Sequence, residues 1–493
     1  MSSDDQEFPP QLSEGDNFIA GPLPDDESEA EPSVDEAAIA AQARRDLVAV
    51  EAELDRRWPE TKIEPSLTRI STLVNLLGDP QRTYPVLHVA GTNGKSSTAR
   101  MIEALLSRLG LRVGRYTSPH LQLATERISI DGAPVSPETY VATYRDIAPF
   151  VGMVDGAQAP GDPAMSKFEV LTGMAFAAFA DAPVEAAVLE TGMGGRWDAT
   201  NVADAQVAVI TPVGIDHAEY LGHDRATIAG EKAGIIKPDS VVVLAEQEPD
   251  AERVLLERAV EVEAAVARAG SEFGVLDRTI AVGGQLLRLQ GLGGVYEEVF
   301  LPLHGAHQAA NAAVALAAVE AFFGAGKDRQ LTVDAVREAF AEVATPGRLE
   351  RVRAAPAVLL DAAHNPHGAA ALAATVEEEF AFRRLAAVVG VLRDKDVTGV
   401  LEALEPAVSD IVVTTNSSPR AMPADELAAL AVSIFGEERV TVEPVLHAAI
   451  EAAVALVEQT DEPEEPLSGG GVLVTGSVVT AGDARTLFGK EPE

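Results

Sequence analysis

The chain has 493 residues, no cysteine, and 77 Asp and Glu against 38 Lys and Arg, which gives a formal net charge of −39. This length exceeds one ordinary hydrophobic core, so it predicts two domains, with three also open. The lack of cysteine excludes disulfides, thiolate zinc sites and cysteine nucleophiles, and the acidic balance argues against sequence-independent binding to nucleic acid, which requires a basic surface.

The N-terminal segment has the composition of an acidic tail. Residues 1–40 hold twelve Asp and Glu and no Lys or Arg, with several Pro and Ser, which is typical of disordered chain. The segment lacks the basic start and apolar stretch of a secretory signal, and the chain contains no run of eighteen apolar residues. We therefore expect no membrane span and a cytoplasmic location.

A strand, a glycine turn and a helix are predicted early in the chain. Residues 37–58 have the pattern of an amphipathic helix, and a second helix is expected before residue 78. The sequence V-L-H-V-A-G-T-N-G-K-S-S-T then predicts a strand over residues 86–90 that leads through the glycines into a helix over 96–108.

This turn is suited to binding an anion. Gly91 and Gly94 permit close approach of the backbone, so the loop amides can point at a ligand while Lys95 and the helix dipole add positive potential. The ligand that fits is a polyphosphate. Only Thr92 and Asn93 separate the two glycines, where the standard P-loop has four residues, so a glycine turn with a chance lysine is the alternative.

Apolar strands alternate with helices through the rest of the first half, which predicts a parallel α/β architecture. The expected strands cover residues 112–116, 127–130, 186–190, 206–211 and 240–244, with a glycine-rich strand region over 282–294. Helices are expected over 166–180, 228–238 and 309–323, and a loop rich in Gly, Pro and Ala over 152–164.

The alternation of strands and helices starts afresh after T-P-G-R-L-E at residues 345–350, which we interpret as a hinge. Strands are expected over 357–360, 386–392, 410–414 and 471–475, with a mobile acidic loop over 461–470. The predicted fold is therefore a P-loop-type, doubly wound α/β domain followed by a smaller Rossmann-like α/β domain. The predicted division is a tail at 1–40, a central domain at 41–344 and a C-terminal domain at 345–493.

Three polar side chains follow predicted strands near the phosphate loop. Ser118, Glu190 and His217 offer one hydroxyl, one carboxylate and one imidazole, a set that suits Mg²⁺ ions bound to nucleotide phosphates. For any one of them a structural hydrogen bond is the simpler explanation, but three around one loop favour the metal. Asp216 either orients the imidazole of His217 or caps a turn.

Other polar groups leave more than one interpretation open. From the residues alone, Lys232 beside Glu231 is a surface or phosphate-contacting lysine, although a neutral amine near metals could instead take up CO₂ as a carbamate. His364 and Asn365 follow a strand of the second domain and face the expected cleft, or else form a turn. Arg348 is a candidate phosphate clamp at the hinge.

Together these segments resemble the bacterial dihydrofolate synthase/folylpolyglutamate synthase family, relatives of the Mur ligases. The resemblance covers residues 51–487, and its motifs in chain order are G-T-N-G-K, S-P-H-L with E-R-I, F-E, G-M-G-G-R-W-D-A-T-N, D-H, E-K-A-G-I-I-K, P-G-R and D-A-A-H-N-P-H-G. It implies ATP-dependent amide ligation of L-glutamate to dihydropteroate or a reduced folate.

The resemblance also implies roles for single residues. The ATP contacts are Thr92, Asn93, Gly94, Lys95, Ser96, Asn311, Arg348, Asp361 and His364, and the Mg²⁺ ligands are Ser118, Glu190 and His217. The segments that line the pteroate pocket are Ile63, Glu64 and Pro65, then Ser166, Lys167, Phe168 and Glu169, then Trp197, Asp198 and Ala199. The residues expected to act in catalysis are Lys95, Glu190, His217 and Lys232.

Two positions need separate comment. Lys232 matches the position that the family carries as a carboxylated lysine, which reverses the preference reached from the residues alone. The family usually has glycine after the loop lysine, whereas Ser96 resembles the G-K-[ST] of Mur ligases. The resemblance also implies a monovalent cation and a monomer.

The implied mechanism is activation of the substrate carboxylate by ATP as an acyl phosphate, which the amine of glutamate then attacks. Two alternatives remain: a cell-wall Mur ligase that joins an amino acid to a nucleotide-sugar peptide, and a non-catalytic regulator that binds ATP or folate. No nucleic acid or membrane partner is expected.

Overall fold

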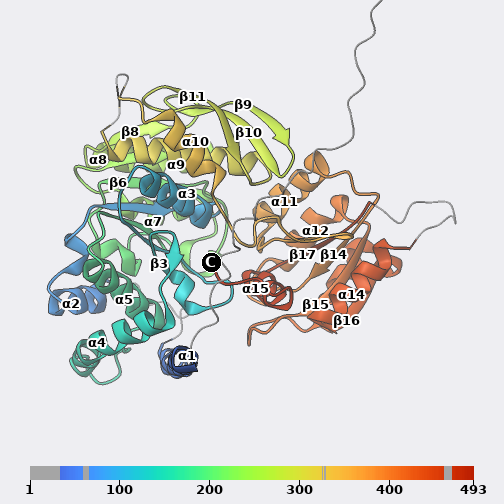
Figure 1. Ribbon diagram of the computed structural model, residues 1–493, viewed down its shortest axis with the longest axis horizontal. Helices are drawn as coiled ribbons and strands as arrows, with labels where there is room; N and C mark the ends of the chain where they lie inside the picture. Colours follow the sequence, from blue (N-terminus) through green and yellow to red (C-terminus); the bar gives the residue numbers. More distant parts are fainter. Residues whose placement is uncertain (1–33, 59–65, 325, 327–328, 460–468) are drawn as a thin grey trace, which may run out of the picture.

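The structure is a computed structural model, and it describes residues 34–58, 66–324, 326, 329–459 and 469–493. Most of the predicted tail, Ile63, Glu64 and Pro65 of the predicted pocket, and most of the predicted loop over 461–470 lie outside these residues. The described chain forms two α/β bodies, which stand left and right in Figure 1, and a small antiparallel sheet.

The larger sheet has eight strands in the order β4-β3-β2-β5-β1-β6-β7-β8, of which β2 and β5 to β8 run parallel to β1. Its central strands are short apolar runs that are buried on both faces, as a parallel sheet requires. The strands are β1 Val86–Ala90, β2 Val113–Tyr116, β3 Ile128–Ile130, β4 Ala133–Pro134, β5 Ala186–Glu190, β6 Val207–Ile210, β7 Val241–Leu244 and β8 Ala265–Arg268.

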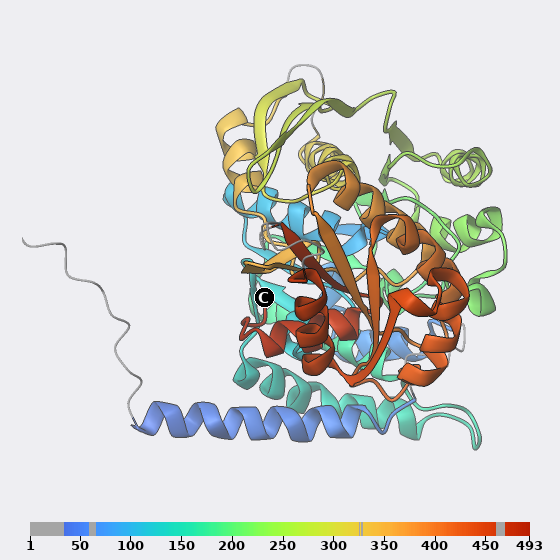
Figure 2. The same ribbon diagram turned by 90° about the vertical axis from the view of Figure 1, so that its right-hand side faces the viewer.

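Helices cover both faces of this sheet, which confirms the predicted doubly wound architecture. On one face lie α3 Lys95–Arg108, α9 Ala306–Phe322 and α10 Val333–Ala341. On the other lie α1 Val34–Leu54, α2 Thr68–Leu76, α4 Pro137–Gly156 and α5 Lys167–Asp181, with α6 Ala218–Leu221, α7 Arg225–Lys232 and α8 Pro249–Glu261 further along. Figure 2 shows α1 lying across the base of the molecule beside α4.

A three-stranded antiparallel sheet follows β8 in the chain. It consists of β9 Gly274–Ala281, β10 Gly284–Gln290 and β11 Val295–Leu301, in the order β11-β10-β9. The sequence predicted only a glycine-rich strand region here, because these strands carry several exposed residues and lack the long apolar runs of the parallel sheet.

The second α/β body has six strands in the order β12-β13-β17-β14-β15-β16, all parallel except β12. They are β12 Glu350–Ala354, β13 Ala357–Leu360, β14 Arg384–Val389, β15 Asp410–Thr415, β16 Val440–Val445 and β17 Gly470–Thr475. On one face lie α11 Pro366–Glu379, α12 Val397–Leu404 and α13 Ala424–Phe435, and on the other α14 Leu446–Val457 and α15 Val478–Leu487. This confirms the second α/β unit; β16 was not predicted.

Several boundaries differ from the sequence prediction; for example, the helix expected over 228–238 begins at Arg225 and its α-helical part ends at Lys232. Helix α1 begins at Val34, so residues 34–40, assigned to the tail, are helical, and the helix ends at Leu54. The predicted loop over 152–164 is wrong for its first residues, because α4 continues to Gly156 and buries Val151 and Val154 in the core. None of the helices in the described ranges is both long and apolar enough to cross a lipid bilayer.

Candidate active site

Strand order explains why distant polar residues meet. Strands β2, β5, β1 and β6 are successive neighbours in the sheet, and they are parallel, so their carboxyl ends lie at one edge. Ser118 follows β2, Glu190 ends β5, the phosphate loop follows β1, and His217 lies beyond β6. The chain order reverses around β1, which is where open α/β sheets bind ligands.

The phosphate loop has the geometry that its glycines predict. Gly94 has φ +85°, and a Cβ there would lie 2.6 Å from Oδ1 of Asn311 on α9. A Cβ on Gly91 would lie 1.8 Å from the hydroxyl oxygen of Thr211. The Lys95 ammonium donates to the Thr92 carbonyl at 3.2 Å. The loop therefore wraps the N-terminal end of α3, and the side chain of Asn311 packs against it at Gly94.

Glu190 is a buried carboxylate with one oxygen unpartnered. Its Oε1 accepts a hydrogen bond from the hydroxyl of Ser96 at 3.0 Å, whereas Oε2 is buried and has no hydrogen-bond partner among the described residues. Burial raises the pKa of Glu190, while the Lys95 charge and the Ser118 backbone amide act in the opposite direction. An unpartnered carboxylate oxygen beside a phosphate loop fits a Mg²⁺ ligand.

His217 supplies a neutral imidazole at the same edge. It stands at the start of α6 with φ +52°, and burial lowers its pKa to about 4, so the ring is neutral at pH 7. A neutral ring nitrogen is the form that binds metal. Within the described residues no cluster of three His, Asp or Glu side chains forms a metal site on its own, so the hydroxyl of Ser118 and the phosphates of a nucleotide would have to complete the set.

Lys232 is buried, so of the two interpretations drawn from the residues alone, a surface or a phosphate-contacting lysine, the surface one is wrong. Its side chain reaches the phosphate loop and donates to the carbonyl oxygen of Gly91 at 2.6 Å, with only 4 % of the residue exposed. Burial and the nearby charge of Lys95 lower the pKa of Lys232 to about 7. The Lys232 amine is therefore neutral in a large fraction of the molecules near pH 7.

Hydrogen bonds join the two bodies directly over the phosphate loop. Asn93 and Asn365 exchange side-chain hydrogen bonds at 3.0 and 3.3 Å. The carboxylate of Asp216 accepts from Asn365 at 3.2 Å and from the Lys395 ammonium at 2.8 Å. Burial raises the pKa of Asp216, but the nearby His364 and the positive charge of Lys395 outweigh it, so this pKa lies well below its ordinary value.

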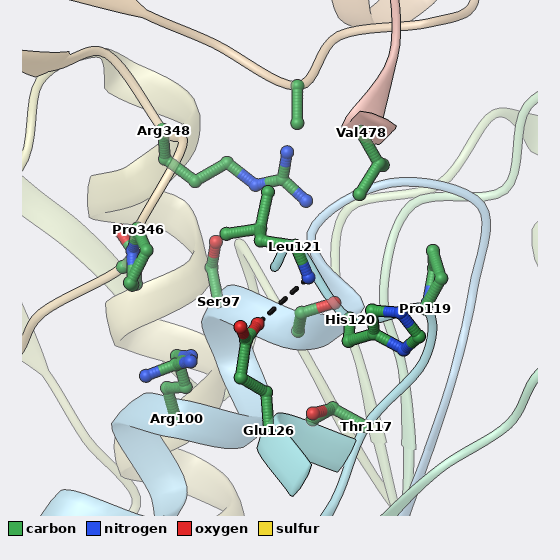
Figure 3. A pocket seen from close by; sticks show the side chains of 13 residues that line it. Ser97, Arg100, Thr117, Pro119, His120, Leu121, Glu126, Pro346, Arg348 and Val478 are labelled. Carbon is green, nitrogen blue, oxygen red and sulfur yellow. Dashed lines mark hydrogen bonds between the residues drawn. The ribbon is translucent and has the colours of Figure 1, made fainter. Parts of the chain in front are cut away.

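The predicted residues of the linker have distinct roles. Arg348 lines a small cavity with Ser96, and Figure 3 shows its guanidinium extending between Pro346 and Val478. The carboxylate of Asp361 accepts the backbone amides of Leu349 at 3.0 Å and Ala363 at 2.8 Å, so it holds the linker against β13.

His364 lies on the opposite side of the cleft from the large sheet. Its Nδ1 lies 3.0 Å from the carbonyl oxygen of Ala362, and its Nε2 lies 3.6 Å from the Asp216 carboxylate. The imidazole thus lies beside Asp216, and His364 immediately precedes Asn365, which bonds to Asn93 of the phosphate loop.

A large cavity of about 840 Å³ opens beside Ser118 and His217. Its wall contains six of the residues predicted for the pteroate pocket: Ser166, Phe168, Glu169, Trp197, Asp198 and Ala199. Lys167 is not in this wall, because its ammonium is bonded to Glu51 and Asp55 of the α1 segment. The sequence did not predict Trp58, Arg69, Met193, Ile215, Tyr220 or Arg420, which also line the cavity.

Several charged residues of the wall are held by their own contacts, and aromatic rings form another part of the wall. Glu169 pairs with Arg69 at 3.1 Å and caps α5, and Asp198 accepts the amides of Met193 and Thr200. The ring of Phe168 lies so close to Gly192 that a Cβ there would be 2.6 Å from it. Polar residues of the second body, among them Asn365, Lys395 and Arg420, also line the cavity, and we call this part its polar end.

Comparisons with known proteins agree with this geometry. A family model described as Mur ligase, glutamate ligase domain matches residues 347–478, and one described as Mur ligase middle domain matches residues 153–319. The dihydrofolate synthase/folylpolyglutamate synthase of Mycobacterium tuberculosis is 60% identical over 461 residues, which are 91% of this chain and 95% of that protein. The Bacillus subtilis protein of the same name is 35% identical over 74% of this chain and 84% of its own length.

Solved structures match along the whole described architecture. Mycobacterium tuberculosis folylpolyglutamate synthase complexed with ADP has a TM-score of 0.88 and 59% identity, covering 92% of this chain and 100% of that one. Escherichia coli FolC in complex with DHPP and ADP has a TM-score of 0.76 and 31% identity, covering 90% and 97%. This chain belongs to the dihydrofolate synthase/folylpolyglutamate synthase family of Mur ligases.

Proposed function

We propose that this chain is an ATP-dependent ligase that adds L-glutamate to dihydropteroate, to reduced folates, or to both. The observation that carries the proposal is the meeting of a phosphate loop and an aromatic cavity of about 840 Å³ at Ser118 and His217. A nucleotide on the loop and a flat pterin in the cavity would bring a phosphoryl group and a carboxylate together.

ATP is held by the loop and by the linker. The amides of Thr92, Asn93, Gly94 and the first turn of α3 face the phosphates, and Lys95 and Ser96 begin that helix. Asn311 stands behind Gly94, and Arg348, Asp361 and His364 close the site from the second body. Relatives solved with ADP support this placement.

Ser118, Glu190 and His217 would hold Mg²⁺, since Glu190 offers an unpartnered oxygen and His217 a neutral ring. Bound there, the ion supplies positive charge to phosphate oxygens. The monovalent cation expected from the resemblance stays a prediction, which turnover in potassium and sodium buffers would test.

The chemistry proceeds in two balanced steps. An oxygen of the substrate carboxylate attacks the γ-phosphorus of ATP, the bond to the β-phosphate oxygen breaks, and ADP leaves while Lys95 and the loop amides stabilise the developing charge. The amine of glutamate then attacks the acyl carbon, loses a proton, and expels inorganic phosphate. The contacts of Asn93 with Asn365 and of Asp216 with Lys395 keep the two bodies closed, which excludes water from the acyl phosphate.

Lys232 is proposed to react with CO₂. The ammonium first gives up one proton; the neutral amine then attacks the carbon of CO₂ and loses a second proton, which leaves an anionic carbamate beside the metal site. The buried position of Lys232 at the Gly91 carbonyl supports this, because an ammonium there is poorly solvated. Incubation with ¹³C-labelled bicarbonate should give a carbamate carbon signal that Lys232→Met lacks.

The cavity is proposed as the pteroate site. Phe168, Trp197 and Tyr220 supply rings for a flat heterocycle, and Arg420 and Lys395 stand at the polar end for the acidic part of the substrate. Ile63, Glu64 and Pro65 belong to the proposed site through the resemblance alone. Lys167 takes part through its backbone, because its ammonium is directed to α1.

The deciding experiment is a parallel assay of phosphate release with ATP and glutamate and one of three acceptors: dihydropteroate, tetrahydrofolate or a UDP-muramoyl peptide. Release with the first or second, and a product heavier by one glutamyl residue, supports the proposal. Turnover only with the third would favour a cell-wall ligase, and no turnover with tight ADP binding would favour a regulator.

The remaining proposals concern the chain as a whole. We place a domain boundary between residues 344 and 345, because every strand of the six-stranded sheet begins after it. We further propose a cytoplasmic monomer that binds neither nucleic acid nor membrane. Sedimentation at several protein concentrations tests the oligomeric state.

A further inference from the structure

Trp58 occupies a wall of the large cavity, although neither the sequence motifs nor the matched family models include it. The family models begin at residue 153, whereas Trp58 follows the C-terminal end of α1. Its side chain is half-buried and lines the same cavity as Phe168, Trp197 and Tyr220. The segment that follows α1 thus contributes an aromatic ring to the proposed pteroate site.

The backbone of Trp58 is fixed to the start of α5. The carbonyl oxygen of Trp58 accepts the amide of Lys167 at 3.1 Å, and Trp58 forms a parallel bridge with Ser166. Lys167 and Ser166 stand next to Phe168, so this bridge sets the position of one ring of the cavity relative to another.

Side chains on both sides of the bridge hold α1 in place. The ammonium of Lys167 donates to Glu51 at 2.8 Å and to Asp55 at 2.7 Å, and Tyr140 of α4 donates to Glu51 at 2.5 Å. The guanidinium of Arg57 donates to Asp155 at 2.9 Å. Glu51, Asp55 and Arg57 shortly precede Trp58 in the chain, so these contacts fix the segment that carries the indole.

We propose that Trp58 is a substrate-contacting residue that stacks on the heterocyclic ring of the pteroate or folate substrate, and that α1 and Lys167 serve to position it. The inference rests on the proposed function, since it names a contact of that same site. Flat aromatic ligands gain affinity from stacking on indole, and loss of one such contact weakens binding about tenfold.

Fluorescence gives a direct test, because the two tryptophans of the chain, Trp58 and Trp197, both line this cavity. In Trp197→Phe the only indole is Trp58. Addition of dihydropteroate to this variant should quench its fluorescence, and addition of ADP alone should leave it nearly unchanged. An emission that dihydropteroate does not alter, at concentrations that support turnover, would overturn the inference.

Kinetics supply an independent readout. Trp58→Ala should raise KM for the pteroate or folate substrate about tenfold and leave KM for ATP unchanged. Trp58→Phe, which keeps an aromatic ring, should have a KM close to that of the unaltered chain. The double variant Glu51→Gln, Asp55→Asn should raise the same KM, because it releases Lys167 from α1. Val48→Ala, on the exposed face of the same helix, is the matched control and should have no effect.

The outcomes separate this inference from the proposed function. If the unaltered chain turns over dihydropteroate or tetrahydrofolate while Trp58→Ala retains its KM, the inference fails and the function stands. If the unaltered chain turns over neither, the proposed function itself fails.

Discussion

The ion pair between Asp216 and Lys395 is expected to contribute more free energy than an exposed ion pair, because it is buried and joins the two bodies. Both side chains are only 10% exposed, and their charged atoms lie 2.8 Å apart. At an effective dielectric constant of about 20, two unit charges at this distance attract by about 6 kcal/mol. The loss of water from both groups offsets most of this, and we expect about 2 kcal/mol to remain.

The perturbation is Lys395→Met, which keeps the length of the side chain and removes its charge. It leaves the Asp216 carboxylate at the interface with the amide of His217, Asn365 and His364 as its remaining partners. We expect kcat/KM for ADP formation to fall about 30-fold, since 1.4 kcal/mol is a factor of ten. In the background Asp216→Asn the same substitution should cost only about threefold, because the charge that Lys395 balances is already absent.

The assay is a double-mutant cycle on kcat/KM, with phosphate release followed under steady-state conditions. Arg393→Met is the control, because Arg393 stands two residues earlier in the same loop and its ion pair with Glu426 is exposed on both sides. If the two single effects simply multiply in the double variant, Lys395 acts on its own and the argument from the buried pair is refuted.

The other predictions concern the phosphate loop and its neighbours. Glu190→Ala should reduce ADP formation at least a thousandfold while quenching by dihydropteroate persists; full activity would remove Glu190 from the metal site. Ser96→Gly removes the hydrogen bond that orients Oε1 of Glu190, so the Mg²⁺ concentration at half-maximal activity should rise several-fold with kcat little changed. Ser96→Thr keeps a hydroxyl and should behave as the unaltered chain in a Mg²⁺ titration. Gly94→Ala places a Cβ 2.6 Å from Asn311 at φ +85°, so ADP affinity measured by calorimetry should fall at least tenfold. The pKa of Lys232 in the folded chain is about 7, below its ordinary value, so between pH 7 and 10 the unfolded chain binds more protons than the folded chain. The stability of the folded chain therefore rises over this range. The Tm of the unaltered chain relative to that of Lys232→Met should increase from pH 7 to pH 10, and a constant difference would contradict the low pKa.

The sequence by itself was sufficient for features that depend on neighbouring residues. The strand at Val86–Ala90, the glycine turn and the following helix were predicted within one residue, because apolar runs, positive-φ glycines and helical spacing are local signals. Ser118, Glu190 and His217 were recognised as strand-end residues for the same reason. The boundaries of α1 were predicted less well, and the helix α4 was not predicted, its last residues having been assigned to a loop.

Only the tertiary structure decided which of these residues meet, and what surrounds them. Asn93 and Asn365 are 272 positions apart and become partners because two separately folded sheets face each other. Lysine is usually exposed, and Lys232 is buried because the end of α7 lies against Gly91. Trp58 enters the cavity through a bridge to Ser166 that no spacing in the chain indicates. The strands and turns follow from local chemistry, whereas burial and partnership are set by contacts between distant segments that a linear pattern does not contain.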